Sequence, residues 1–288
     1  MPSPPLALTL RSLLAVCLLT LSTASLSAAT LTVDGDATDW GFTVADNNGS
    51  TFVPDGSLNL VGLFVEDSDD LAGDYEPVGP SLGGQNYDCE VLAAAVQGSD
   101  LHLIVVSGQR PDNGLTRYAP GDLRITTSAG VFGVEMGGGP GGGPGTMQVG
   151  GETGSTYTLD NDGYSVSHAD AAPAQTVGSV WANPNWIFDL VPPTGETQLD
   201  ISGGGTYVGD ATFRFTRDMV TTQHSIIELS IPLSFFGGAM INGIAYYPAC
   251  GNDELVLDTQ FVPEPSTFGL AALAAVALMP WWRRRRGR

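Results

Sequence analysis

Lysine is absent from this 288-residue chain, and eleven arginines stand against 31 acidic residues, for a formal net charge of -20. A chain so poor in cations repels phosphate, so nucleic acid and anionic lipid surfaces are poor partners. Divalent cations suit it better. The acidity also has a simpler use, which is to keep a secreted domain soluble.

Cysteine is scarce too, with three in the chain. Cys17 lies in the N-terminal apolar segment, which leaves Cys89 and Cys250 as an even pair. In an oxidising compartment, a disulfide between them would close a loop of about 160 residues and add up to roughly 5 kcal/mol. The alternative is a pair of buried thiols that pack as small apolar groups.

Signatures of common enzyme classes are also missing. No P-loop occurs. Residues 79–83 match Gly-x-Ser-x-Gly and residues 137–142 match Gly-x-Gly-x-x-Gly, but both lie in glycine- and proline-rich stretches expected to be loops, without the strand-to-helix turn that these motifs require. His102, His168 and His224 lie far apart, without metal-ligand spacing. We therefore expect a protein that is not an enzyme. A secreted hydrolase built from two carboxylates is the alternative, although no particular pair of acids indicates it.

Residues 1–29 have the features of a secretory signal peptide. Arg11 precedes the apolar run Leu13–Leu21, and Ser27-Ala28-Ala29 offers the small-x-small pattern that signal peptidase accepts. We predict cleavage near Ala29–Thr30 and export of the chain that follows.

Residues 262–288 form a second addressing segment. It opens with Val262, Pro263, Glu264 and Pro265, and these prolines disfavour a helix or a central strand. An apolar run from Phe268 to Trp282 follows, slightly short for a full span. The cluster Arg283, Arg284, Arg285 and Arg286 then suits the cytoplasmic flank of a membrane helix. The pattern predicts a single C-terminal transmembrane helix.

This order of proline motif, short apolar helix and terminal arginine cluster resembles the PEP-CTERM sorting signal. The resemblance implies an exosortase of a Gram-negative bacterium that cuts near Pro263-Glu264-Pro265. It also implies transient residence in the inner membrane, followed by release to the cell surface or an extracellular polymer matrix. A permanent membrane anchor that is never cut is the alternative.

The stretch between the two addressing segments, residues 30–261, reads as many short β segments separated by Gly, Pro, Asn and Asp. This spacing predicts an all-β sandwich or barrel. Residues 137–151 are rich in glycine and proline, and we expect a long loop there within one domain. The expected strands are 60–65, 87–96, 101–107, 123–127, 131–136, 157–159, 164–167, 177–181, 212–216, 225–231, 243–247 and 255–260. Residues 101–106 are almost continuously apolar, so their strand should be covered on both faces.

Near the mature N-terminus, Asp34, Asp36 and Asp39 form the pattern Asp-Gly-Asp-Ala-Thr-Asp-Trp. Three short carboxylates around a glycine can wrap a hard cation such as calcium. The alternative is a polar turn after the first strand, with Trp40 buried.

This opening resembles the sandwich domains of carbohydrate-binding module family nine and the DOMON-like group. Four further segments support the resemblance: 84–90, 101–108, 224–237 and 249–253. It implies a β-sandwich of the jelly-roll or galactose-binding type, with carbohydrate, such as the host exopolysaccharide, as a ligand. No sugar-binding aromatic position carries over residue by residue.

Two further groups of acids have alternative interpretations. Glu66, Asp67, Asp69, Asp70, Asp74 and Glu76 form either a solvated acidic loop or a calcium site. Asp88 and Glu90 should share one face of a strand, with Cys89 on the other. That pair either joins a site or lines a wet edge, and we favour the edge.

Overall fold

The part of the chain that the computed structural model describes is built of antiparallel β-sheets and two short 3-10 helices. It comprises residues 29–45, 50–66, 88–108, 111, 121–137, 148–149, 152–153, 156–160, 163–167, 177–187, 198–200, 204–216, 224–248 and 253–261. The all-β prediction is confirmed. No helix in these ranges is long and apolar enough to cross a membrane.

Several predictions concern residues outside the described ranges. These are the signal peptide up to residue 28, the sorting signal 262–288, Cys250, the acidic loop after Glu66 and most of the glycine-rich stretch 137–151. They stay predictions.

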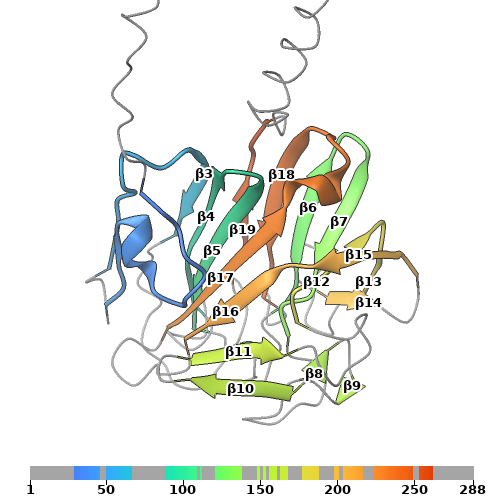
Figure 1. Ribbon diagram of the computed structural model, residues 1–288, viewed down its shortest axis with the longest axis horizontal. Helices are drawn as coiled ribbons and strands as arrows, with labels where there is room; N and C mark the ends of the chain where they lie inside the picture. The colour runs from blue at the N-terminus through green and yellow to red at the C-terminus, as the bar shows by residue number, and fades with distance from the viewer. Residues whose placement is uncertain are drawn as a thin grey trace, which may run out of the picture.

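One main sheet has seven strands in the order β10-β11-β16-β17-β5-β4-β3 (Figure 1). Its hairpin β4–β5 pairs Gln97 with Asp100, as the Gly-Ser turn between them predicts. Asp160 and Gly163 likewise close the β10–β11 hairpin. The strands are β3 (Leu60–Val65), β4 (Cys89–Gln97), β5 (Asp100–Ser107), β10 (Thr156–Asp160), β11 (Gly163–Ser167), β16 (Thr212–Phe215) and β17 (Ser225–Pro232).

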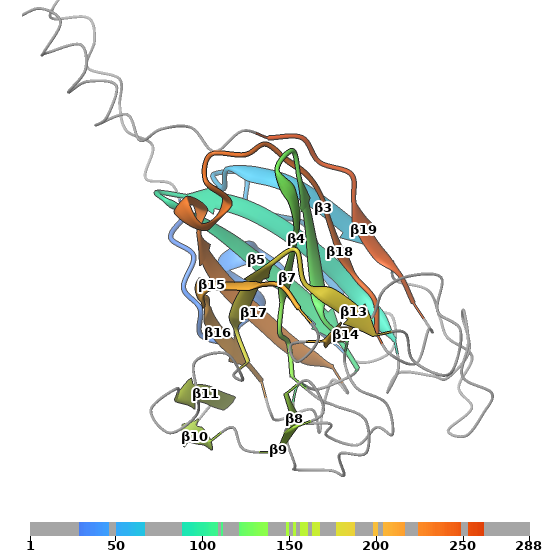
Figure 2. The same ribbon diagram turned by 90° about the vertical axis from the view of Figure 1, so that its right-hand side faces the viewer.

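The other main sheet has six strands in the order β15-β12-β7-β6-β18-β19. It faces the first sheet (Figure 2). Its strands are β6 (Leu123–Thr127), β7 (Gly130–Val134), β12 (Ser179–Ala182), β15 (Thr206–Asp210), β18 (Ile241–Tyr246) and β19 (Leu255–Leu257). The smaller elements are η1 (Ala37–Trp40), η3 (Leu233–Phe236), and the strand pairs β1 (Phe42–Thr43) with β2 (Thr51–Phe52), β8 (Gln148–Val149) with β9 (Glu152–Thr153), and β13 (Asn185–Ile187) with β14 (Gln198–Asp200).

The main core lies between the two sheets. Alternate residues of strands such as β5 point into it: Leu101, Leu103 and Val105 face buried residues such as Ile125 and Ile244 of the opposite sheet. Fully burying one such side chain stabilises a fold by about 1.5–3 kcal/mol. The apolar side chains buried between the sheets therefore hold the two sheets together.

A second apolar cluster covers part of the outer face of the seven-stranded sheet, over β3, β4 and β5. The N-terminal segment lays Trp40, Phe42 and Phe52 over residues of β4 and β5 such as Val91 and Ile104. Strand β5 is consequently buried on both faces, as its continuous apolar run predicts.

The two ends of the described chain lie at the same end of the sandwich. The Leu31 backbone N–H donates to Oε1 of Gln97, at the β4–β5 turn, over 2.7 Å. Phe261 pairs with Ile241, at the start of β18. Figure 1 shows this end at the top. We call the opposite end, where β4 and β17 begin and β5 ends, the distal end.

Candidate metal centre

Three neighbouring strands bring chemistry-bearing residues together at the distal end. In the order β4-β5-β17, Cys89 and Ser225 both pair with Ser107 of the middle strand. Asp88 and His224, one residue further out, therefore lie on either side of Gly108. The Gly108 backbone N–H donates to the carbonyl oxygen of Asp88 over 2.7 Å. Because glycine has no side chain, the flanking residues can meet across the middle strand.

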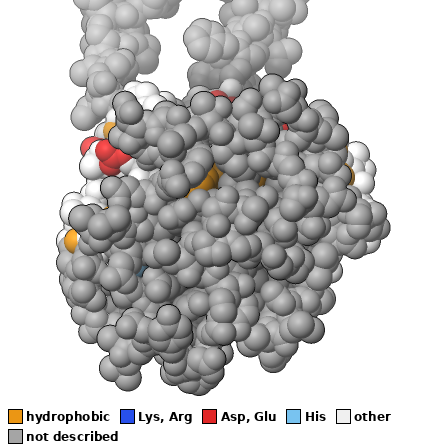
Figure 3. Space-filling model, turned by 90° about the horizontal axis from the view of Figure 1, so that it is seen from below, with side chains coloured by type: hydrophobic (Ala, Val, Ile, Leu, Met, Phe, Trp, Pro, Cys, Tyr) orange, Lys and Arg blue, Asp and Glu red, His pale blue; other side chains and the backbone are white. Residues whose placement is uncertain are grey.

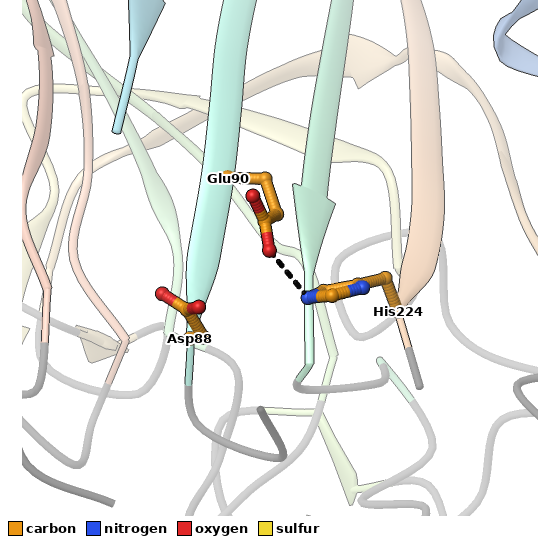
Figure 4. A group of neighbouring side chains, drawn as sticks. All are labelled: Asp88, Glu90 and His224. Carbon is orange, nitrogen blue, oxygen red and sulfur yellow. Dashed lines mark ion pairs between the residues drawn. The ribbon is translucent and has the colours of Figure 1, made fainter. Parts of the chain in front are cut away.

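Glu90 occupies a bulge in β4. Cys89 pairs with Ser107 and Val91 with Val106, so Glu90 is an extra residue without a partner on β5. A β-bulge re-aims the side chain of the extra residue. Here the Glu90 side chain turns toward His224 on the far side of β5 (Figure 4).

Asp88, Glu90 and His224 form a compact triad. Each offers one ligand atom, and these three atoms lie within 4.8 Å of one another. The closest pair is Nε2 of His224 and Oε1 of Glu90, at 2.7 Å.

All three side chains of the triad are buried. Asp88 is 0% exposed, His224 1% and Glu90 4%. The second carboxylate oxygen of Glu90, Oε2, is buried and accepts no hydrogen bond from the described residues. Figure 3 shows the molecule from the side of the distal end, with acidic side chains visible at one edge of the outline. The triad therefore places two carboxylates where water cannot screen them.

Asp88 belongs to a second group as well. Glu66, Asp88 and Asp253 also offer ligand atoms within 4.8 Å of one another. The Asp253 carboxylate is held in place because its Oδ2 accepts the Cys89 backbone N–H over 2.7 Å. Further carboxylate oxygens that could bind a metal therefore lie next to the triad, on the side of β4 where β3 pairs.

The structure corrects one expectation from the sequence. Asp88 and Glu90 do not line a wet edge, because β4 is an interior strand between β5 and β3, and both side chains are buried. They lie in a buried cluster with His224 instead. Sequence reasoning missed His224, which is 134 positions from Glu90 in the chain (224 minus 90) and comes near it only through strand pairing.

The predicted calcium ligands Asp34, Asp36 and Asp39 each accept a backbone N–H. Oδ1 of Asp34 accepts from Asp36, Oδ1 of Asp36 from Thr38, and Oδ2 of Asp39 from Thr32. Among the residues that the structure describes, these three carboxylates are not one of the groups whose ligand atoms converge within 4.8 Å. Burial, together with the charges of Asp34 and Asp36, raises the pKa of Asp39. Calcium at this turn stays a prediction.

The same N-terminal turn is anchored by a buried acid of β17. Oε2 of Glu228 accepts the backbone N–H groups of Asp34 and Gly35, at 2.9 and 2.7 Å. Burial raises the pKa of Glu228 to about 8, although the three N–H groups aimed at it act in the opposite direction. Trp40, the third donor, is buried as the polar-turn interpretation expects.

A second buried acid, Asp122, links the chain just after β7 to β14 of the small β13–β14 sheet. Its two oxygens accept the backbone N–H groups of Met136 and Leu199, each at 2.7 Å. Burial raises the pKa of Asp122 to about 7, although the hydrogen bonds from these two N–H groups and from the Glu135 carboxyl lower it. Asp122 is 2% exposed and Glu135 1%, so this pair of acids is placed to hold backbone rather than to meet a substrate.

Of the two cysteines in the predicted disulfide, Cys89 lies within the described residues. Cys89 is fully buried in the main core, and its Sγ lies 3.3 Å from Oγ of Ser107. Cys250 lies outside the described residues.

Comparison of the chain with protein-family models, curated proteins and solved structures finds no match.

Proposed function

We propose that this chain is an exported, non-enzymatic binding protein of the bacterial cell surface or extracellular matrix. It is delivered by an exosortase-type system after signal peptidase has removed residues 1–29. In this proposal residues 262–288 cross the inner membrane until they are cut, and the β-sandwich of residues 30–261 is the exported part.

The observation that carries this proposal is the polarity of the sandwich. Ala29 and Phe261, the ends of the described chain, lie at one end, and the cluster around Asp88 lies at the other (Figure 1). A chain held by a C-terminal tail would thus present the distal end away from the membrane. This orientation would make the distal end accessible to a ligand, as a binding protein requires. A protein that served only as a spacer would not require buried acids at that end.

The finer fold assignment belongs to the same proposal. Two facing antiparallel sheets and an N-terminal segment packed over one outer face are compatible with a jelly-roll or galactose-binding-like sandwich. This likeness supports carbohydrate, in particular the host exopolysaccharide, as the ligand class. A pull-down with that polymer tests it, and absence of retention would remove the carbohydrate assignment without affecting the sorting proposal.

The sorting step is tested by replacing Pro263, Glu264 and Pro265 with alanine. We expect the full-length chain to accumulate in the membrane and to disappear from the outside of the cell. Replacing Pro192 and Pro193 with alanine is the matched control, which should leave export unchanged.

Intact mass of the wild-type protein collected from the cell surface separates the two anchoring models. A mass that corresponds to a chain ending near Pro265 supports cleavage. A mass that still includes Trp281, Trp282 and the arginines would contradict it and favour a permanent anchor.

A further inference from the structure

The triad of Asp88, Glu90 and His224 brings three metal-ligating side chains together in the protein interior. Two carboxylates lie together in the interior, and a histidine faces them. The buried Oε2 of Glu90 also lacks a hydrogen-bond donor among the described residues. Buried charges of this kind are usually paired or bound to a metal.

The donor atoms indicate which cations fit. One imidazole nitrogen and two carboxylates match zinc and neighbouring transition metals, whereas calcium requires six to eight oxygens. Ligand bonds to zinc are about 2.0–2.2 Å long, so atoms bound to one ion lie about 3–3.5 Å apart. Ligand atoms within 4.8 Å of one another can reach this spacing by small side-chain rotations.

We propose that Asp88, Glu90 and His224 bind a zinc-type divalent cation. The ion would replace the direct contact between Oε1 of Glu90 and Nε2 of His224. It would cross-link the beginning of β4 to the residue that precedes β17, over the end of β5. Asp253 and Glu66, which share Asp88 with the triad, lie where a further oxygen ligand or an outer-shell contact is needed.

The burial of the triad makes this a structural site rather than an open catalytic one. The ion would close the distal end and fix the segments on either side of β5. This inference does not depend on how the chain is sorted, so its failure would leave the sorting proposal intact.

The test uses the purified full chain in detergent, without an affinity tag, after removal of metals with a chelator. We expect calorimetric titration with zinc to show one tight site and a rise in melting temperature. Calcium at the same concentration should produce a much smaller rise. A wild-type chain that binds no zinc would overturn the proposal.

His224→Gln and Glu90→Gln should each weaken zinc binding by at least about tenfold. The matched controls are His102→Gln, which removes a buried histidine of β5, and His168→Gln. Both controls should bind zinc like the wild type. Equal zinc affinity in His224→Gln and wild type would contradict the assignment.

A buried ion pair without a metal would also make these two variants unstable, so a second measurement is needed. Cobalt(II) in place of zinc reports its ligands through visible absorption. We expect the wild type and both control variants to develop the bands of a low-coordinate site with a nitrogen ligand. If cobalt produces only the spectrum of the hydrated ion with the folded wild type, Glu90 and His224 are an ion pair and the proposal is wrong.

Discussion

The indole Nε1 of Trp40 donates a hydrogen bond of 2.9 Å to Oε1 of Glu228, across 188 positions of the chain. The same carboxyl group accepts the backbone N–H groups of Asp34 and Gly35. One side chain of β17 therefore holds the N-terminal turn and positions η1. The apolar residues that follow can then cover the outer face of β4 and β5.

Trp40→Phe should lower the free energy of unfolding by about 2–4 kcal/mol. The substitution leaves a cavity and deprives a buried acceptor of its donor. Urea unfolding measures the loss. Trp181→Phe is the matched control, because its Nε1 donates to Oγ of Ser179, two residues away in the same strand. The control should lose about 1–2 kcal/mol. An equal or smaller loss in Trp40→Phe would contradict the anchoring role.

The stability of the protein should fall as pH rises from about 4.5 to about 8. Glu228 ionises at its ordinary pKa of 4.5 in the unfolded chain but at about 8 in the folded protein. The unfolded state therefore binds fewer protons than the folded state in this window, and rising pH favours unfolding. Asp122, with its pKa raised from 3.8 to about 7, contributes in the same direction at lower pH.

Glu228→Gln should flatten this dependence, most clearly close to pH 8, because Asp122 with its pKa of about 7 is mostly ionised there. Each group contributes at most about 1.4 kcal/mol per pH unit. The unfolding free energy across this range is the measurement. Asp258→Asn, which removes an exposed carboxylate, controls for the change in net charge and should leave the slope unchanged. A slope in Glu228→Gln identical to that of the wild type would count against the raised pKa.

Asp36→Ala tests whether the N-terminal acids are caps or calcium ligands. Asp36 is the N-cap residue of η1, and its side chain accepts the Thr38 N–H. Loss of such a cap costs about 0.5–2 kcal/mol. If capping is the whole role, the loss is the same in calcium and in chelator. A melting temperature of the wild type that rises with calcium, and fails to rise in Asp36→Ala, would instead establish the calcium site.

The β architecture could be predicted because its signals are local. Turn residues between short apolar runs place the β4–β5 and β10–β11 hairpins, and the continuous run in β5 predicts a strand covered on both faces. Strands β1, β2, β13 and β14 have two or three residues each, too few to show a period. They were therefore missed. They depend on contacts made by the folded chain rather than on their own pattern.

The triad could not be predicted, for a related physical reason. Asp88 and Glu90 are visible as neighbouring acids, but their burial depends on β4 becoming an interior strand. The direction of the Glu90 side chain depends on a bulge, which exists only relative to the partner strand. His224 reaches them through the register of β17 on β5. A histidine immediately before an apolar strand was the only local signal.

Gly121→Ala should be one of the most destabilising single-methyl additions in the described part of the chain. Gly121 has φ +84°, and an added Cβ would overlap the carbonyl oxygen of Tyr247, where the chain leaves β18. Backbone atoms cannot move aside as a flexible side chain can. Overpacking and left-handed strain together should cost about 2–4 kcal/mol.

Gly56→Ala is the matched control, since nothing lies within 4 Å of its added Cβ, and it should change stability by less than about 0.5 kcal/mol. Chemical denaturation of both variants measures the difference. If Gly121→Ala were as stable as Gly56→Ala, the start of β6 would not pack against the Tyr247 backbone, and the placement of Asp122 beside it would also have to change.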